Sequence, residues 1–247
     1  MDWHKRFMQQ AAWSSSLRAY LFKRCGMDTA SRVLEVGCGT GAILAGLTTP
    51  FALHGLDLMS GRLVEARQHA PHAWLTRGDA LSLPYSSAAF EITFCHFLLL
   101  WIRDPLQALQ EMKRVTFSGG HILALAEPDY TARLDEPAAL APLGRWQAAA
   151  LHAQGADPGM GRRLADLFRQ AGLQIVETGV LQASLQPALT LEDWQMEWSV
   201  MEDDLSGSVP AKELLRLKRL DKIAWESGRR VLYVPTYFAW GRVTQMV

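Results

Sequence analysis

The sequence lacks an excess of charge of either sign, since 25 Lys and Arg are balanced by 25 Asp and Glu. Sequence-independent binding to nucleic acid depends on excess positive charge, so the balance argues against such a partner. The sequence also lacks an apolar run of the ~20 residues that a membrane-spanning helix needs, because its run FLLLWI covers only residues 97–102. We therefore expect no nucleic-acid partner and no membrane partner.

Cysteine is scarce as well, with Cys25, Cys38 and Cys95 as the whole complement. These three show neither the spacing of a metal site nor a pairing pattern, which predicts no bound metal and a reducing, cytoplasmic environment. The opening residues, MDWHKRFMQQ, hold no apolar signal-peptide core, in keeping with that location. Apolar residues make up 49% of the 247, enough for one large α/β domain or two small ones.

Between residues 30 and 128, short apolar runs alternate with amphipathic segments. The runs stand at residues 32–36, 52–56, 73–77, 90–95 and 121–127. The stretches between them predict helices near residues 60–70 and 104–115, with Ser60 and Asp104 as N-caps and Pro105 in the first turn. Alternation of strands and helices predicts a parallel, doubly wound sheet.

Helical patterns flank this core on both sides. We expect a single domain over residues 1–247, with a helical lid at 1–30 that stops at Gly26 and a core at 31–128. Further expected elements are a mixed cover at 129–160, a helix at 161–172, a strand at 173–181, a helical cover at 190–228 and one long final strand at 229–243.

The stretch VLEVGCGTG, residues 33–41, ends an apolar run in Gly37, Gly39 and Gly41. A strand that runs through glycines into a helix forms a cradle for an anion or a nucleotide, because glycine lets a ligand approach the backbone. The segment GCGTGA also fits the dinucleotide pattern G-x-G-x-x-A, so a nicotinamide-dependent oxidoreductase is one interpretation. A plain tight turn is another.

Three carboxylates near the loop favour a different ligand. Glu35 precedes the first glycine by two residues, and a carboxylate there suits an ammonium group and suits a pyrophosphate poorly. Asp57, at the end of the second run, can accept both hydroxyls of a ribose. Asp79 follows the third run, where an adenine amine can donate to it. Together they predict a ligand with an amino acid at one end, a ribose in the middle and an adenine at the other end.

On VLEVGCGTG, GLDL and the segment from GDALSLPY to AEPDY, the sequence resembles class I S-adenosylmethionine (SAM)-dependent methyltransferases. The general type is the small-molecule group that includes the ubiquinone and menaquinone biosynthesis C-methyltransferases. The resemblance covers residues 30–128 strongly and the rest by architecture. It implies an α/β, Rossmann-like fold whose seven-stranded sheet is mostly parallel, with the last strand antiparallel beside the fifth.

The resemblance also implies roles for single residues. Gly37, Gly39 and Gly41 would shape the methionine side of the pocket, Asp57 would hold the ribose, and Leu58 and Met59 would flank the adenine, edged by Asp79 and Ala80. The whole predicted SAM-binding set is Arg18, Glu35, Gly37, Cys38, Gly39, Gly41, Asp57, Leu58, Met59, Gly78, Asp79, Ala80, Leu81, Cys95 and His96. The N-P-P-Y segment of nucleobase amino methyltransferases is absent after the fourth run, which argues against a DNA or RNA base as acceptor.

Methyl transfer starts from an activated donor, so positioning and water exclusion do much of the catalysis, and a base is needed only if the acceptor must lose a proton. His96, at the end of the fourth run, is a candidate for SAM contact or general base, with a core histidine bonded to backbone as the alternative. Glu127 and Asp129, after the fifth run, are candidates for orienting the acceptor, with capping of the following turn as the alternative.

Most tryptophans fall outside the core runs, which predicts a dry acceptor pocket for an apolar or aromatic molecule. The predicted wall of this pocket consists of Trp13, Tyr20, Tyr130, Trp146 and Trp194. Arg18 and Tyr20 are further expected to close over the SAM carboxylate, unless Arg18 lies on a solvated helix face. The sequence thus predicts a SAM-dependent methyltransferase of a small molecule, monomeric or homodimeric. A SAM-binding protein without methyl transfer and an NAD(P)-dependent oxidoreductase are the alternatives.

Overall fold

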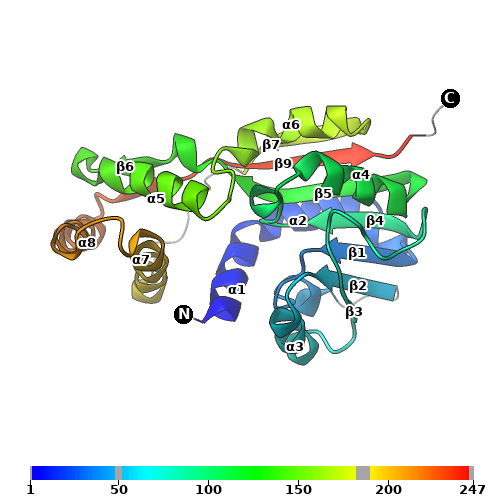
Figure 1. Cartoon of the computed structure of the whole chain (residues 1–247), viewed down its shortest axis with the longest axis horizontal. Helices are drawn as coiled ribbons and strands as arrows, with labels where there is room; N and C mark the ends of the chain where they lie inside the picture. Colours follow the sequence, from blue (N-terminus) through cyan, green and yellow to red (C-terminus); the bar gives the residue numbers. More distant parts are fainter. Residues whose placement is uncertain (1, 48–51, 182–189, 245–247) are drawn as a thin grey trace.

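The computed structural model describes residues 2–47, 52–181 and 190–244, and its centre is a seven-stranded sheet in the order β3-β2-β1-β4-β5-β9-β7 (Figure 1). The strands are β1 (Arg32–Val36), β2 (Ala52–Asp57), β3 (Trp74–Arg77), β4 (Phe90–Cys95), β5 (Thr116–Pro128), β7 (Gln174–Val180) and β9 (Thr236–Arg242). The pairs from β3 to β5 are parallel, whereas β9 is antiparallel to both β5 and β7. The predicted fold, including an antiparallel last strand beside the fifth, is confirmed.

Helices cover both faces of the sheet because its central strands are apolar on both sides. The helices α4 (Pro105–Val115) and α6 (Met160–Gln170) pack on one face, and α2 (Ser15–Arg24) packs on the other together with Leu63 of α3 (Ser60–His69). Asp104 caps α4 as predicted, since its side chain accepts a hydrogen bond from the Gln107 amide at 3.0 Å. The predicted cap at Ser60 is wrong, because α3 begins at Ser60 and Met59 is its N-cap residue.

Two predicted elements are each divided in the structure. The N-terminal helical stretch is α1 (Trp3–Trp13) followed by α2, with the break at Ser14, and Gly26 follows α2 in a left-handed conformation. The predicted long final strand is wrong, because β8 (Val231–Tyr233) pairs with β6 (Leu134–Glu136) in a separate sheet before β9 begins. Pro235 lies between β8 and β9, and a proline has no amide to continue a ladder.

The helices α5 (Ala141–Ala153), α7 (Leu191–Leu205) and α8 (Ala211–Glu226), together with β6 and β8, form what we call the cap, beside one end of the sheet (Figure 1). The cap has an apolar core of its own, which includes Leu143, Trp194, Trp198 and Leu217. Among the described residues, no helix combines the length and the apolar character needed to cross a bilayer.

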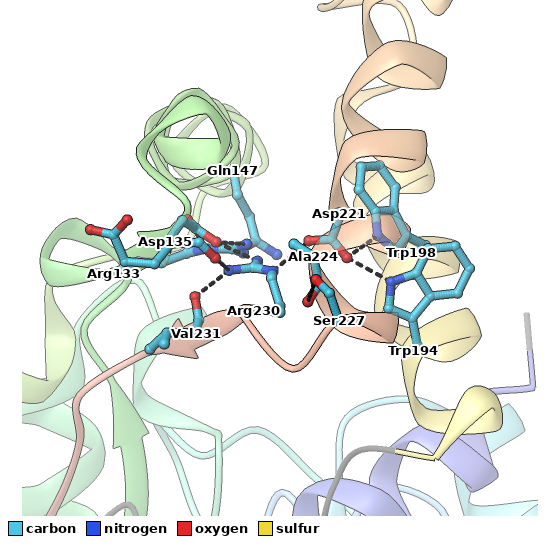
Figure 2. A network of polar contacts seen from close by, with 11 residues as sticks. Arg133, Asp135, Gln147, Trp194, Trp198, Asp221, Ala224, Ser227, Arg230 and Val231 are labelled. Carbon is cyan, nitrogen blue, oxygen red and sulfur yellow. Dashed lines mark hydrogen bonds and ion pairs between the residues drawn. The ribbon is translucent and has the colours of Figure 1, made fainter.

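A buried polar network ties the strands of the cap to its helices (Figure 2). Four charged side chains alternate in sign along it, in the order Arg133, Asp135, Arg230 and Asp221. Arg230 lies 2.5 Å from Asp135 and 2.5 Å from Asp221, and Asp221 also accepts the indole N–H groups of Trp194 and Trp198 at 2.6 and 3.0 Å. Charges can be buried here because each one has a partner of opposite sign.

Candidate cofactor and active site

The glycine loop after β1 has a conformation that requires glycine. Gly37, Gly39 and Gly41 have φ angles of +75°, +54° and +78°, where side chains are strained. A Cβ atom at Gly37 would lie 2.6 Å from a methyl group of Leu98, and one at Gly39 would lie 3.2 Å from the ring of Phe7. The absence of side chains therefore lets Leu98 and Phe7 pack closely against the backbone of the loop.

Three amide groups of this loop already donate hydrogen bonds within the protein. The Gly37 and Cys38 amides donate to the Leu56 carbonyl at 2.7 and 2.9 Å, and the Gly39 amide donates to Asp57 Oδ2 at 2.9 Å. The loop is followed by a single 3-10 turn, η2 (Leu44–Gly46), so the expectation that it leads directly into a helix is wrong. A phosphate cradle needs free amides at a helix N-terminus, and these three amides do not supply it.

Glu35 is the most unusual polar group of the site. It is 3% exposed at the end of β1, and its Oε2 atom has no hydrogen-bond partner. Burial raises the pKa of Glu35 well above its usual value, Arg18 lowers it, and Asp57 raises it further. An unpaired carboxylate oxygen in a buried position is costly, and a ligand cation such as an ammonium group would relieve that cost. Glu35 therefore fits the amino-acid end of SAM.

The ends of β2 and β3 fit the nucleoside end of the same ligand. The carboxylate of Asp57 accepts from the Gly39 and Met59 amides at 2.9 Å each, and two carboxylate oxygens have further lone pairs for ribose hydroxyls. Leu58 and Met59 next to it are 59% and 53% exposed, an apolar pair of the kind that a purine ring can cover. Asp79 is exposed nearby, with Oδ1 accepting from the Leu81 amide at 2.9 Å.

Four further residues of the predicted SAM-binding set are structural neighbours of these groups. Gly78 donates its amide to the Asp57 carbonyl at 3.1 Å, and Ala80 is buried in the core beneath. Cys38 and Cys95 are buried too, and burial raises the pKa of both thiols, which makes them packing groups rather than thiolates.

His96 follows β4 and is held by a side chain that the sequence analysis missed. Its Nε2 atom lies 2.9 Å from Oγ of Ser14, and that hydroxyl also accepts from Arg18 Nη1 at 2.8 Å. Burial, and then the charge of Arg18, lower the pKa of His96 to about 3, so the ring is neutral at neutral pH. No local signal pointed to Ser14, because its partner is 82 positions away in the chain.

The two carboxylates after β5 have local structural partners. Glu127 is fully buried, and its oxygens accept from the amides of Leu98, Leu99 and Leu100 at 3.0, 2.9 and 3.1 Å. Burial raises its pKa to about 7, while these three amides lower it. It therefore fixes the turn after β4 and does not reach toward an acceptor.

Asp129 accepts from the Thr131 amide at 3.1 Å and pairs with Arg162 at 2.5 Å, so it caps the following turn, η4 (Tyr130–Ala132). This capping role matches the alternative stated for Asp129, whereas Glu127 holds the turn after β4 instead, and neither is retained as a candidate for catalysis.

Helix α1 lies across the site between the cap and α3 (Figure 1). On the sheet side, His4 Nδ1 lies 2.8 Å from Oγ1 of Thr40 in the glycine loop. On the cap side, three side chains of α1 contact α7, through the pairs Arg6–Glu197, Lys5–Glu192 and Gln9–Asp193. The expected lid is thus bonded to the glycine loop and to the cap at the same time.

The predicted acceptor wall is only partly assembled at this edge. The Trp13 ring lies 6.3 Å from that of Phe97, next to His96, and Tyr130 packs at the end of β5. Burial raises the pKa of Tyr130 to about 12. Trp146 and Trp194 instead belong to the core of the cap.

The placement of Tyr20 at the site is wrong. Its hydroxyl donates to Glu177 of β7 at 3.0 Å and accepts from Arg24 at 2.8 Å. Glu177 pairs with Trp240 in the middle of β9, so Tyr20 lies beside the outer strand and away from the strand ends.

Comparisons with known proteins agree with this geometry. The family described as "methyltransferase domain" matches residues 34–124, which contain the glycine loop, Asp57, Asp79 and His96. A malonyl-[acyl-carrier protein] O-methyltransferase of Halorhodospira halophila is 36% identical over 100 residues, covering 37% of this chain and 33% of that protein. A demethylmenaquinone methyltransferase of Staphylococcus haemolyticus is 32% identical over 126 residues, covering 48% of this chain and 51% of that protein. The matches thus span about half the length of these relatives or less.

Solved structures show the same fold over nearly the whole chain. The [4+2]-cyclase SpnF has a TM-score of 0.58 at 18% identity, covering 94% of this chain and 82% of that one. Geranyl diphosphate methyltransferase in complex with SAM has a TM-score of 0.57 at 11% identity, covering 92% of this chain and 84% of that one. Residues 34–124 therefore match the methyltransferase-domain family, and the chain as a whole shares the fold of these solved structures.

Proposed function

We propose that this chain binds SAM and transfers its methyl group to a small apolar or aromatic molecule. The observation that carries the proposal is Glu35, whose buried carboxylate has an oxygen without a partner, beside a glycine loop in which the amides of Gly37, Cys38 and Gly39 are already bonded. A dinucleotide would bring a pyrophosphate to this position, where it would meet a carboxylate instead of free amides. SAM would bring an ammonium group.

Different residues of the chain would bind different parts of SAM. Glu35 would receive the ammonium group, Asp57 the ribose, and Leu58, Met59 and Asp79 the adenine. When bound, SAM supplies an electrophilic methyl group on a sulfonium. Helix α1 excludes water from the side that faces the cap, because it is held to both the glycine loop and α7. Water exclusion favours a reaction in which the charge of the sulfonium disappears.

The wall next to His96 favours an aromatic acceptor without a carboxylate. Trp13 and Phe97 supply aromatic surface there, and Tyr130 lies at the end of the neighbouring strand. Arg6 and Arg133 are buried cations whose charges act on Tyr130, and each already has an acidic partner, Glu197 for Arg6 and Asp135 for Arg133. A carboxylate acceptor, such as the name of the malonyl relative describes, would compete for a cation that is in use. A ring such as the name of the menaquinone relative describes would not.

The three free, buried cysteines support the further proposal that the enzyme works in the cytoplasm. The proposal of a monomer or a homodimer stays a prediction from the sequence. A second candidate function is SAM binding without methyl transfer. It is favoured by one specific observation, namely that a [4+2]-cyclase shares the fold over 94% of this chain.

Labelled SAM separates the two candidates. Purified protein would be incubated with methyl-labelled SAM and fractions of a small-molecule extract, followed by analysis of the organic-soluble products. We expect label in a small apolar product, and much less label when Asp57→Ala replaces the wild type at a SAM concentration that does not saturate the variant. Tight SAM binding without labelled product in any fraction would favour the second candidate, and failure to bind SAM would refute both.

A further inference from the structure

Ser14 occupies the junction between α1 and α2, and its buried hydroxyl has three polar neighbours. Arg18 Nη1 lies 2.8 Å from Oγ, His96 Nε2 lies 2.9 Å from it, and the Ala11 carbonyl oxygen lies 3.3 Å from it. A hydroxyl has one hydrogen to donate and two lone pairs to accept with, so the three contacts constrain one another.

The direction of each hydrogen bond follows from the chemistry of the partners. A guanidinium can only donate, so Ser14 Oγ accepts from Arg18. The Ala11 carbonyl already accepts from the same guanidinium, and 3.3 Å is long for a hydroxyl donor. Of the two acceptors within reach of the hydroxyl hydrogen, Nε2 of His96 at 2.9 Å is the closer, so we assign the hydrogen to it. A neutral imidazole that accepts at Nε2 has its own hydrogen at Nδ1.

We propose that Ser14 and Arg18 are positioning residues that hold His96 as the neutral Nδ1–H tautomer, so that His96 offers the methyl acceptor a hydrogen-bond donor and not a base. Among the described residues, Nδ1 of His96 has no hydrogen-bond partner, and His96 as a whole residue is partly exposed. The ring nitrogen that remains available to a ligand is thus Nδ1, which carries the hydrogen.

The charged groups around His96 favour the same protonation state. Arg18 of α2 faces it and disfavours a second proton on the ring. Glu35 of β1 raises the pKa of Arg18 through its charge. The carboxylate of Glu127 of β5 accepts hydrogen bonds from three amides of the turn after β4. No carboxylate of the described residues is bonded to the imidazole to stabilise an imidazolium.

This inference extends the proposed function to a class of acceptor. A donor at Nδ1 suits an acceptor oxygen that is already ionised, such as that of an enolate or a phenolate next to the nucleophilic atom. Such an acceptor needs no base from the protein. Because Ser14 ends the lid helix α1, the tautomer of His96 also depends on the lid being closed.

Nitrogen NMR on the ligand-free protein tests the tautomer without any acceptor. Protein labelled with 15N-histidine would be followed by long-range 1H–15N correlation from pH 5 to 8.5, with His96→Gln to assign the signal. We expect the Nδ1–H pattern throughout, without the midpoint near pH ~6.5 of an ordinary histidine. In Ser14→Ala and in Arg18→Met the pattern should shift toward Nε2–H. Ser16→Ala, an exposed serine of the same helix, should leave it unchanged.

An Nε2–H pattern in the wild type, or a titration midpoint near the ordinary value, would overturn the inference. So would an unchanged pattern in both Ser14→Ala and Arg18→Met. SAM affinity measured on the same samples separates this outcome from failure of the proposed function, because the tautomer is read without SAM and the binding is read without an acceptor.

Discussion

Replacing Arg230 by Met tests how far the buried network holds the cap together. Arg230 pairs with both Asp135 and Asp221, whose side chains are 1% and 4% exposed (Figure 2). Its removal leaves each of these two buried carboxylates without one of the partners that offset its charge. Removing one partner of a buried pair costs about 3–5 kcal/mol. Arg133 still pairs with Asp135, and two indoles still donate to Asp221, so we expect the lower end, about 3 kcal/mol.

The assay is thermal unfolding followed by calorimetry. For a chain of this size, about 3 kcal/mol corresponds to a fall in Tm of roughly 6–12 °C. Arg216→Met is the matched control, because Arg216 lies on α8, the helix that carries Asp221, and its pair with Glu213 is exposed; such pairs contribute about 0–1 kcal/mol. If both variants melt together, the network does not stabilise the cap as its burial implies.

Three further predictions concern the site and its lid. Asp57→Ala should weaken SAM binding roughly 10- to 150-fold in calorimetry, because charge-assisted hydrogen bonds contribute about 1.5–3 kcal/mol, and unchanged affinity in a folded variant would remove Asp57 from the ribose site. Glu197→Gln should speed amide hydrogen exchange in α1 more than Glu192→Gln does, since Glu197 pairs with a buried arginine and Glu192 with an exposed lysine; equal rates would mean that the buried pair does not hold the lid. His96 has a native pKa of about 3, so below pH ~6.5 the unfolded chain binds a proton that the native chain does not, and stability falls as the pH falls. The His96→Gln variant should therefore lose about 2 kcal/mol less stability than the wild type between pH 8 and pH 5, as measured by urea unfolding, and identical pH profiles would contradict the lowered pKa.

The core of the fold could be predicted because its signals are local. Each of β1 to β4 is a short apolar run bounded by polar residues or glycine, and Asp104 with Pro105 marks the start of α4. The division between β8 and β9 was missed although Pro235 was visible, because the apolar pattern on both sides of it is continuous. The pairing of β8 with β6 is a tertiary choice that period and propensity do not encode.

The site divides in the same way. Glu35, Asp57 and Asp79 stand at strand ends, so the topology alone brings them to one edge. The partners of Glu127 are three backbone amides, which carry no sequence signal, and its burial follows from the turn that they form. The contact of Ser14 with His96 depends on how α1 and α2 fold over the sheet, and the placement of Tyr20 beside β7 depends on the same packing.

Calorimetric titration of one protein sample with SAM and with NAD tests the central claim most directly. We predict binding of SAM and none of NAD, with SAM affinity reduced in Glu35→Gln because the ammonium group loses its carboxylate. Tight binding of NAD without binding of SAM would contradict the account, since it would mean that the glycine loop holds a pyrophosphate after all.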